Sequence, residues 1–126
     1  MVKDTKIAVN TWFNTNWTDT LIHFYGLDWD ITGKEEWILV AYEPMQLRQD
    51  SIDFAGYKQN GKIIVSFYAR KENRTFELLD ILMNKLKTVD INNLISSGAT
   101  NIIKDRMNTT NGDYSILTAM IYLKSF

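Results

Sequence analysis

The segment "KIIVSFYARKENRTFELLDILMNKL", residues 62–86, changes its hydrophobic period partway along, and this change constrains the fold more than any other feature. Its first part alternates with a period of two, which predicts a strand. One apolar face of that strand carries Ile63, Val65 and Phe67. Its second part repeats leucine every four residues, which predicts an amphipathic helix. These leucines are Leu78, Leu82 and Leu86. A strand followed by such a helix predicts a sheet with a helix packed on it.

Two Asn-Gly pairs mark the turns that the sequence predicts. Asn60-Gly61 separates an alternating strand at 46–59 from the strand at 62–70, and Asn111-Gly112 precedes a closing strand at 114–123. Asn and Gly tolerate the positive φ angles that a type I′ turn requires at both central positions. Each pair therefore predicts a β-hairpin.

The remaining segments add a second helix and further strands. Residues 2–17 predict a helix, residues 21–25 a short strand, and "EWILVAYE" at 36–43 a central strand that is apolar and covered on both faces. "INNLISSG" at 91–98 predicts a loose extension of the second helix that Gly98 stops. The residues expected on the apolar face of the first helix are Ile7, Ala8, Thr11 and Trp12.

This order of elements predicts an α+β fold, in which a mostly antiparallel mixed β-sheet with two hairpins packs against two α-helices. A chain of 126 residues without repeats or linkers predicts one domain over residues 1–126.

Composition excludes several classes of function. Lys and Arg number 14 against 15 Asp and Glu, so the chain lacks the basic excess of a protein that mainly binds nucleic acid. It has no cysteine, which removes disulfides, thiolate nucleophiles and cysteine metal sites. No apolar run approaches the ~20 residues of a spanning helix. The amino-terminal "MVKDTKIAVNTWF" lacks the apolar core of a signal peptide, so we expect no membrane partner and synthesis in the cytoplasm.

Few residues suggest chemistry. The single histidine, His23, lies among apolar residues in "LIHFY" and has no second histidine or cysteine for a metal site. Asp28 and Asp30 could flank a cation, but the ligand ladder of a calcium loop is missing. Glycine-rich phosphate loops, GxSxG and HExxH do not occur. The sequence therefore predicts no catalytic residue, no cofactor and no metal, and a protein that is not an enzyme.

The amino-terminal third is rich in aromatic residues. They form either a base-stacking platform or part of the core and an interface, and the balanced charge favours the second interpretation. These residues are Trp12, Phe13, Trp17, Tyr25 and Trp29.

The order of segments resembles the tail terminator, or tail-completion, proteins of long-tailed bacteriophages. The similarity spans residues 7–126 and consists of "TLIHFYGLDWD", the Trp37-led "EWILVAYEP", "QLRQDSIDFAGYKQNG" with Gly56 and Gly61, the strand to Tyr68 with its leucine-rich helix, and the closing "YSILTAMIYLKSF". The loop before the helix, "ARKENR", is charged where such proteins are usually glycine-rich.

The resemblance implies a structural protein of the virion at the tail–neck junction. Such proteins form a hexameric ring on the head-proximal end of the tail tube, stop polymerisation of the tube protein, and present a surface to the head connector, or stopper. DNA later passes through the central hole without specific binding. Assembly would take place in the host cytoplasm.

A ring made from one chain needs two different patches on each subunit, and strand edges and hairpin arms suit this role. The arm at 46–60 alternates apolar and charged residues, and we predict that it packs on a neighbouring subunit or on the tube. An ordinary half-buried hairpin within the monomer remains open. The predicted interface residues are Leu47, Arg48, Asp50, Ile52, Phe54 and Tyr57.

Three other functions stay open at this point. The first is another neck component of the stopper type. The second is an α+β module that binds a small ligand or nucleic acid, suggested by the aromatic amino-terminal third. The third is an enzyme that uses His23 with Asp28 or Asp30.

Overall fold

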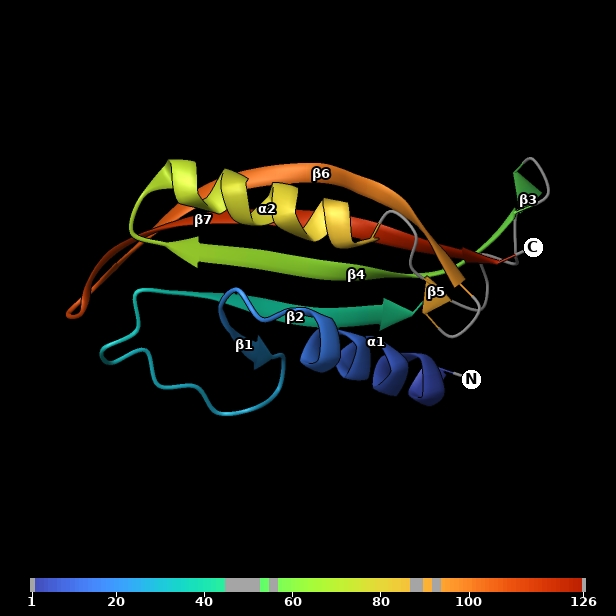
Figure 1. Ribbon diagram of the computed structural model, residues 1–126, viewed down its shortest axis with the longest axis horizontal. Coiled ribbons are helices and arrows are strands. Elements are labelled where there is room, and N and C mark those ends of the chain that lie inside the picture. The colour runs from blue at the N-terminus through green and yellow to red at the C-terminus, as the bar shows by residue number, and fades with distance from the viewer. Residues whose placement is uncertain (1, 45–52, 55–56, 87–89, 92–93, 126) are drawn as a thin grey trace.

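The computed structural model describes residues 2–44, 53–54, 57–86, 90–91 and 94–125 (Figure 1). Within these ranges the chain forms two helices and seven strands, which confirms the α+β class. The elements in chain order are α1 (Val2–Asn16), β1 (Leu21–Phe24), β2 (Glu36–Pro44), β3 (Asp53–Phe54), β4 (Tyr57–Ala69), α2 (Glu72–Leu86), β5 (Asp90–Ile91), β6 (Leu94–Thr109) and β7 (Gly112–Ser125).

All seven strands belong to one sheet. Six of them follow the order β1-β2-β4-β7-β6-β5, and the short strand β3 pairs only with β4. The β1–β2 pair is parallel, and the other pairs are antiparallel. The sheet is therefore mixed and mostly antiparallel, as predicted.

Both helices pack on the same face of the sheet (Figure 1). α2 lies over β4, β7 and β6. α1 contacts β1 and β2 at one edge of the sheet, and it also contacts β5, the last strand at the other edge. The core between the layers consists of side chains that are at most 6% exposed, apart from partly buried neighbours. Its members are Val9, Phe13, Trp17, Ile38, Val40, Ile63, Val65, Phe67, Leu78, Leu79, Leu82, Leu86, Leu117, Ala119, Ile121 and Leu123.

The buried face of α1 differs from the predicted one. Val9 and Phe13, four residues apart, are fully buried, whereas Ile7 is 54% exposed. Thr11 is exposed, and Ala8 and Trp12 are only half-buried. The prediction was wrong because a short helix with apolar residues on two faces does not show by periodicity which face the sheet will cover.

Asn60-Gly61 is not a turn, because both residues lie inside β4. Gly61 pairs with Pro44 of β2, and the Tyr42 side chain lies against it, so that an added Cβ would be 2.5 Å from the Tyr42 hydroxyl oxygen. The pairing of β4 with β7 shifts register between Gln59 and Gly61. The glycine thus serves close packing at a bulge rather than a turn.

The carboxy-terminal hairpin is confirmed, but its surroundings differ from prediction. The turn is at Thr110 and Asn111, one residue earlier than predicted, and Gly112 opens β7 with a φ of 108°. Asn111 does not adopt the positive φ of the predicted type I′ turn. The predicted loose extension ending at Gly98 is instead part of β5 and β6, and β6 runs through Gly98. Register shifts on both sides of Thr100 accommodate this long strand against β7.

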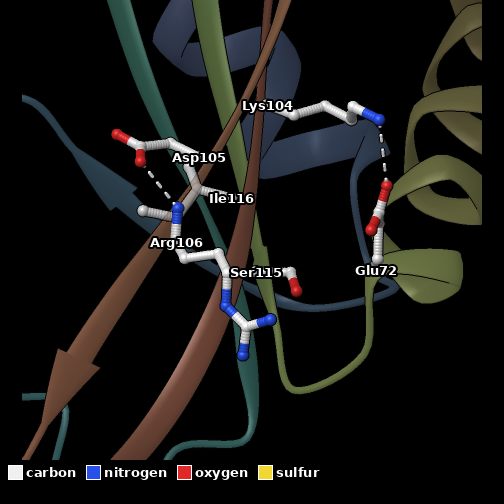
Figure 2. A pocket seen from close by; sticks show the side chains of 6 residues that line it. All are labelled: Glu72, Lys104, Asp105, Arg106, Ser115 and Ile116. Atoms are coloured by element: carbon white, nitrogen blue, oxygen red, sulfur yellow. Dashed lines mark hydrogen bonds and ion pairs between the residues drawn. The ribbon is translucent and has the colours of Figure 1, made fainter.

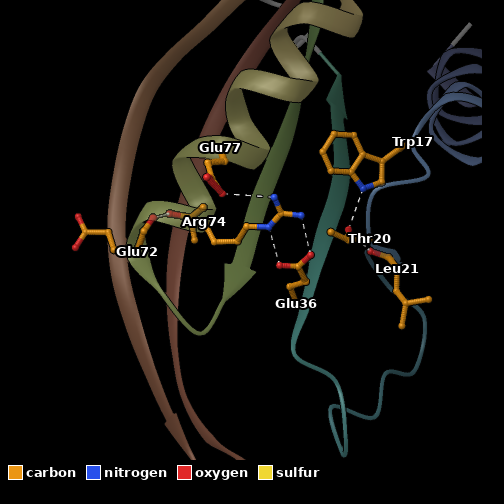
Figure 3. Close-up of polar contacts among 8 residues, drawn as sticks. Trp17, Thr20, Leu21, Glu36, Glu72, Arg74 and Glu77 are labelled. Carbon is orange, nitrogen blue, oxygen red and sulfur yellow. Dashed lines mark hydrogen bonds and ion pairs between the residues drawn. The ribbon is translucent and has the colours of Figure 1, made fainter.

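Polar contacts fasten the helices to the sheet (Figure 3). Arg74 of α2 donates from Nε and Nη2 to the two carboxylate oxygens of Glu36 at 2.9 and 3.0 Å. This bidentate pair raises the pKa of the Arg74 guanidinium. The Trp17 indole donates to Thr20 at 2.9 Å, which fixes the chain between α1 and β1.

Candidate functional site

The second face of the sheet carries a broad surface, here called the open face, that no described helix covers. Successive residues along a strand alternate between the two faces and cross-strand partners share a face, so the chain neighbours of the buried residues point to this side. The open face consists of Leu39, Ala41, Ile64, Ser66, Ile103, Ile116, Thr118, Met120 and Tyr122.

Most open-face side chains are apolar and only half-buried, and Ile103 is 55% exposed. The two hydroxyl groups in its middle, those of Ser66 and Thr118, form a hydrogen bond of 2.8 Å with each other. At the rim, Lys62 and Glu43 form an ion pair at 3.6 Å. The face is therefore apolar with satisfied polar groups, which is typical of a surface that another protein covers.

This surface corrects the prediction that the strand at 36–43 is covered on both sides. β2 lies between β1 and β4, as a central strand does, and its Ile38 and Val40 are buried under the helices. On the opposite side Trp37 is 2% exposed, whereas Leu39 and Ala41 are only half-buried. β2 is therefore covered along its whole helix-facing side, and on the opposite side it is covered only at the Trp37 end.

Aromatic rings close that end. Trp37 stacks on Tyr68 at 4.8 Å and meets Tyr114 edge-on at 4.9 Å. The loop between β1 and β2 adds Trp29, whose ring is 6.3 Å from Trp37 and stacks on His23 at 4.9 Å. These five rings form the aromatic cluster.

A polar tether holds the β1–β2 loop on the cluster. The Tyr114 hydroxyl donates to the carbonyl oxygen of Lys34 at 2.6 Å. The Asn111 amide donates to the same hydroxyl at 2.7 Å and to the carbonyl oxygen of Ile31 at 2.8 Å. Arg70 stacks over the Tyr114 ring at 4.1 Å. The loop is thus fixed to the turn of the β6–β7 hairpin.

Burial raises the pKa of the Tyr68 phenol, and the nearby Asp105 carboxylate raises it further. The unfolded chain has a tyrosine pKa of about 10. The stability that the neutral phenol supplies is therefore complete below that pH and is lost as the pH rises toward the folded pKa.

Tyr68→Phe is accordingly expected to lose less stability than wild type between about pH 9 and about pH 11, and Asp105→Asn to show part of this effect. Urea unfolding at each pH measures it. Equal pH slopes in wild type and Tyr68→Phe would contradict the expectation.

A polar cleft of about 360 Å³ lies near the start of α2, between that helix and the β6–β7 hairpin (Figure 2). The register places Lys104, Arg106 and Ser115 on the α2 side of the sheet. Lys104 reaches Glu72 of α2 at 3.3 Å, as Figure 2 shows. The residues that line the cleft are Glu72, Lys104, Asp105, Arg106, Ser115 and Ile116.

The predicted interface arm falls mainly outside the described residues. Leu47, Arg48, Asp50 and Ile52 lie there. Phe54 pairs with Tyr57 through the backbone as β3 meets β4. The interface role of the arm remains a prediction.

The residues considered for chemistry do not converge on a reactive site. His23 donates from Nε2 to the carbonyl oxygen of Leu27 at 2.8 Å, so this nitrogen carries the proton. The Asp30 carboxylate accepts the Thr32 N–H at 2.9 Å, and this bond lowers the pKa of Asp30. In the part of the chain that the structure describes, no three His, Cys, Asp or Glu side chains gather as a metal site.

The amino-terminal aromatic residues are dispersed rather than joined in one platform. Phe13 and Trp17 are buried in the core, Trp12 packs edge-on against Phe13, and Trp29 belongs to the aromatic cluster. Tyr25 is 70% exposed. Sequence reasoning missed the open face and the tether from Asn111, although the alternation of Ile64, Ser66 and Tyr68 was visible.

Comparisons with known proteins give a fold and no family. No protein-family model matches the chain, and no curated protein matches it. A solved structure with no functional name has a TM-score of 0.53 and 14% sequence identity, and the match covers 95% of each chain. This likeness shows that the fold occurs in another protein over nearly its full length.

Neither of the described helices has the length and apolarity to cross a membrane.

Proposed function

We propose that the protein is a structural component of a long-tailed bacteriophage. It forms a homomeric ring, hexameric as the sequence resemblance implies, on the head-proximal end of the tail tube. The ring ends polymerisation of the tube protein and joins the tail to the head connector. DNA passes through its central hole without specific binding.

The open face is the observation that carries this proposal. A seven-stranded sheet with both described helices on one side leaves a wide apolar surface among the described residues, and such surfaces are covered by protein in assemblies. We assign to it the contact with the tail tube, because it is broad and because its polar groups, Ser66, Thr118, Lys62 and Glu43, are already paired. The sheet edges then remain for contacts between neighbouring subunits.

The chemistry of the described residues supports a role without catalysis. His23 is engaged by the Leu27 carbonyl group and by stacking on Trp29. The nearly balanced charge also suits a channel for DNA, since few phosphates would be neutralised and DNA could slide.

The test compares two isoleucines of equal exposure on opposite sides of the molecule. Ile103 lies on the open face and is 55% exposed, and Ile7 lies on α1 and is 54% exposed. Tail tubes made from the tube protein of the same virus are mixed with wild type, Ile103→Lys or Ile7→Lys and imaged in negative stain. Further tube protein is then added and tube length is measured.

Wild type and Ile7→Lys are expected to decorate one tube end and stop growth there. Ile103→Lys is expected to leave the ends bare, because a lysine would have to lose its hydration in an apolar contact. Undecorated tubes with wild type would overturn the proposal. Binding of wild type to connector complexes but not to tubes would point instead to a stopper-type neck component.

A further inference from the structure

The polar cleft holds two groups without partners. The Arg106 guanidinium takes part in no ion pair or side-chain hydrogen bond among the described residues, and only its backbone N–H donates, to Asp105. Ser115, directly opposite on β7, is 8% exposed, and its hydroxyl has no partner within the described ranges. Among the described residues the buried side-chain polar atom without a partner is the Trp29 indole nitrogen, so the Ser115 hydroxyl is open to solvent in the cleft and can bind a group that enters it. The pair of Arg106 and Ser115 therefore fits a ligand group that enters the cleft.

The charges around the cleft favour a single carboxylate. The Lys104 charge is matched by Glu72, so Arg106 supplies the unbalanced positive charge beside the amino-terminal end of α2. The fork of a guanidinium fits a carboxylate in a bidentate manner. The Asp105 carboxylate points away from Lys104 and Glu72, and Glu72 beside the cleft would repel a polyanion such as a DNA backbone. The ligand that fits is an acidic side chain of a protein.

A loop of the same chain offers such a side chain. Tyr25 and Leu27 are 70% and 65% exposed, more than any other large apolar residue described. The next residue, Asp28, is exposed and has no partner among the described residues. Apolar side chains beside an unpaired carboxylate are typical of a protein-binding tip. We call Tyr25–Asp28 the docking loop.

Hydrogen bonds hold the backbone of the docking loop at Tyr25 and Leu27. The Tyr25 N–H donates to the Val40 carbonyl oxygen at 2.9 Å, and the Leu27 N–H donates to the Phe24 carbonyl oxygen at 3.2 Å. Gly26 has a φ of 94°, which a glycine adopts without strain. His23 holds the Leu27 carbonyl group. Because the loop is already ordered, binding it to another surface requires little further ordering.

We propose that the docking loop of one subunit enters the polar cleft of the next, where the Asp28 carboxylate binds the Arg106 guanidinium and the Ser115 hydroxyl. This inference rests on the proposed ring. The loop follows β1 at one edge of the sheet, and the cleft lies by β6 near the other. Two different patches at opposite edges form a head-to-tail contact that can close into a ring.

Charge reversal tests the contact. Asp28→Arg and Arg106→Asp each place like charges together and are expected to abolish the ring at concentrations where wild type assembles. The double variant restores opposite charges and is expected to assemble. Mixing the two single variants should also give rings, in which the copies alternate. Lys6→Asp and Asp80→Arg, which change exposed charges on the two helices, are matched controls and should assemble as wild type does.

Mass by light scattering measures assembly in solution, negative-stain images measure it on tube tips, and circular dichroism checks folding. Rings of the single variants alone, or no assembly of the mixture and the double variant, would overturn this contact. If the single variants form rings and also cap tubes, the proposed function stands although the contact between Asp28 and Arg106 does not. If wild type forms rings that do not bind tubes, and the double variant and the mixture also assemble, the contact between docking loop and cleft stands and the proposed function is overturned. Wild type that never assembles, in solution or on tubes, overturns both.

Discussion

Replacement of Trp37 by alanine is expected to lower the free energy of unfolding by about 3–5 kcal/mol. Trp37 is 2% exposed and is the centre of the aromatic cluster, with Tyr68 stacked on one side and Tyr114 edge-on. Its removal deletes the largest buried side chain of that side of the sheet and leaves a cavity that the tethered β1–β2 loop cannot easily fill. Chemical denaturation followed by circular dichroism measures the change.

Trp37→Phe is the matched control for this prediction. It keeps an aromatic ring against Tyr68 and is expected to lose only about 1–2 kcal/mol, because less apolar surface leaves the cluster. An alanine variant as stable as the phenylalanine variant would show that the cluster is not packed as described.

Gly61→Ala is expected to destabilise the protein by about 1–3 kcal/mol although alanine usually favours ordered structure over glycine. The added Cβ would lie 2.5 Å from the Tyr42 hydroxyl oxygen and 2.8 Å from the Glu43 carbonyl oxygen. A side chain can move away, but the Glu43 backbone is held in the β2–β4 pairing. The same denaturation experiment measures the loss.

A second substitution separates the two clashes at Gly61. Tyr42→Phe removes the nearest atom and should recover part of the stability of Gly61→Ala, while the contacts with the Tyr42 ring carbon Cζ and the Glu43 carbonyl oxygen, both at 2.8 Å, remain. Unchanged or increased stability of Gly61→Ala by itself would contradict the close packing of Gly61 against Tyr42 and Glu43, because a turn with positive φ would also disfavour alanine.

The sequence predicted best where a local pattern determines the structure. The leucines of α2 are spaced so that one stripe is apolar, and Leu78, Leu82 and Leu86 are buried accordingly. The β6–β7 hairpin follows from its turn residues, with Gly112 supplying the positive φ. These features depend on residues close together in the chain.

The misplaced features depend on contacts between distant residues. In the sequence, Asn60-Gly61 predicts a turn, and only the contact of Gly61 with Tyr42 of another strand shows why a glycine is needed there. The strand alternation of Ile64 and Ser66 is plain in the sequence, but it does not show whether a layer covers their face. The tether from Asn111 to Ile31 joins residues far apart in the chain, and no short motif marks it.

The hydrogen bond between Ser66 and Thr118 has a consequence for whatever molecule lies on the open face. One hydroxyl donates and the other accepts, so an apolar covering surface at that point needs to meet only one remaining hydroxyl proton rather than two. We therefore expect Ser66 and Thr118 to be substituted together. Replacing one alone would leave the other hydroxyl unpaired inside a dry contact, whereas replacing both with apolar residues would leave the junction intact.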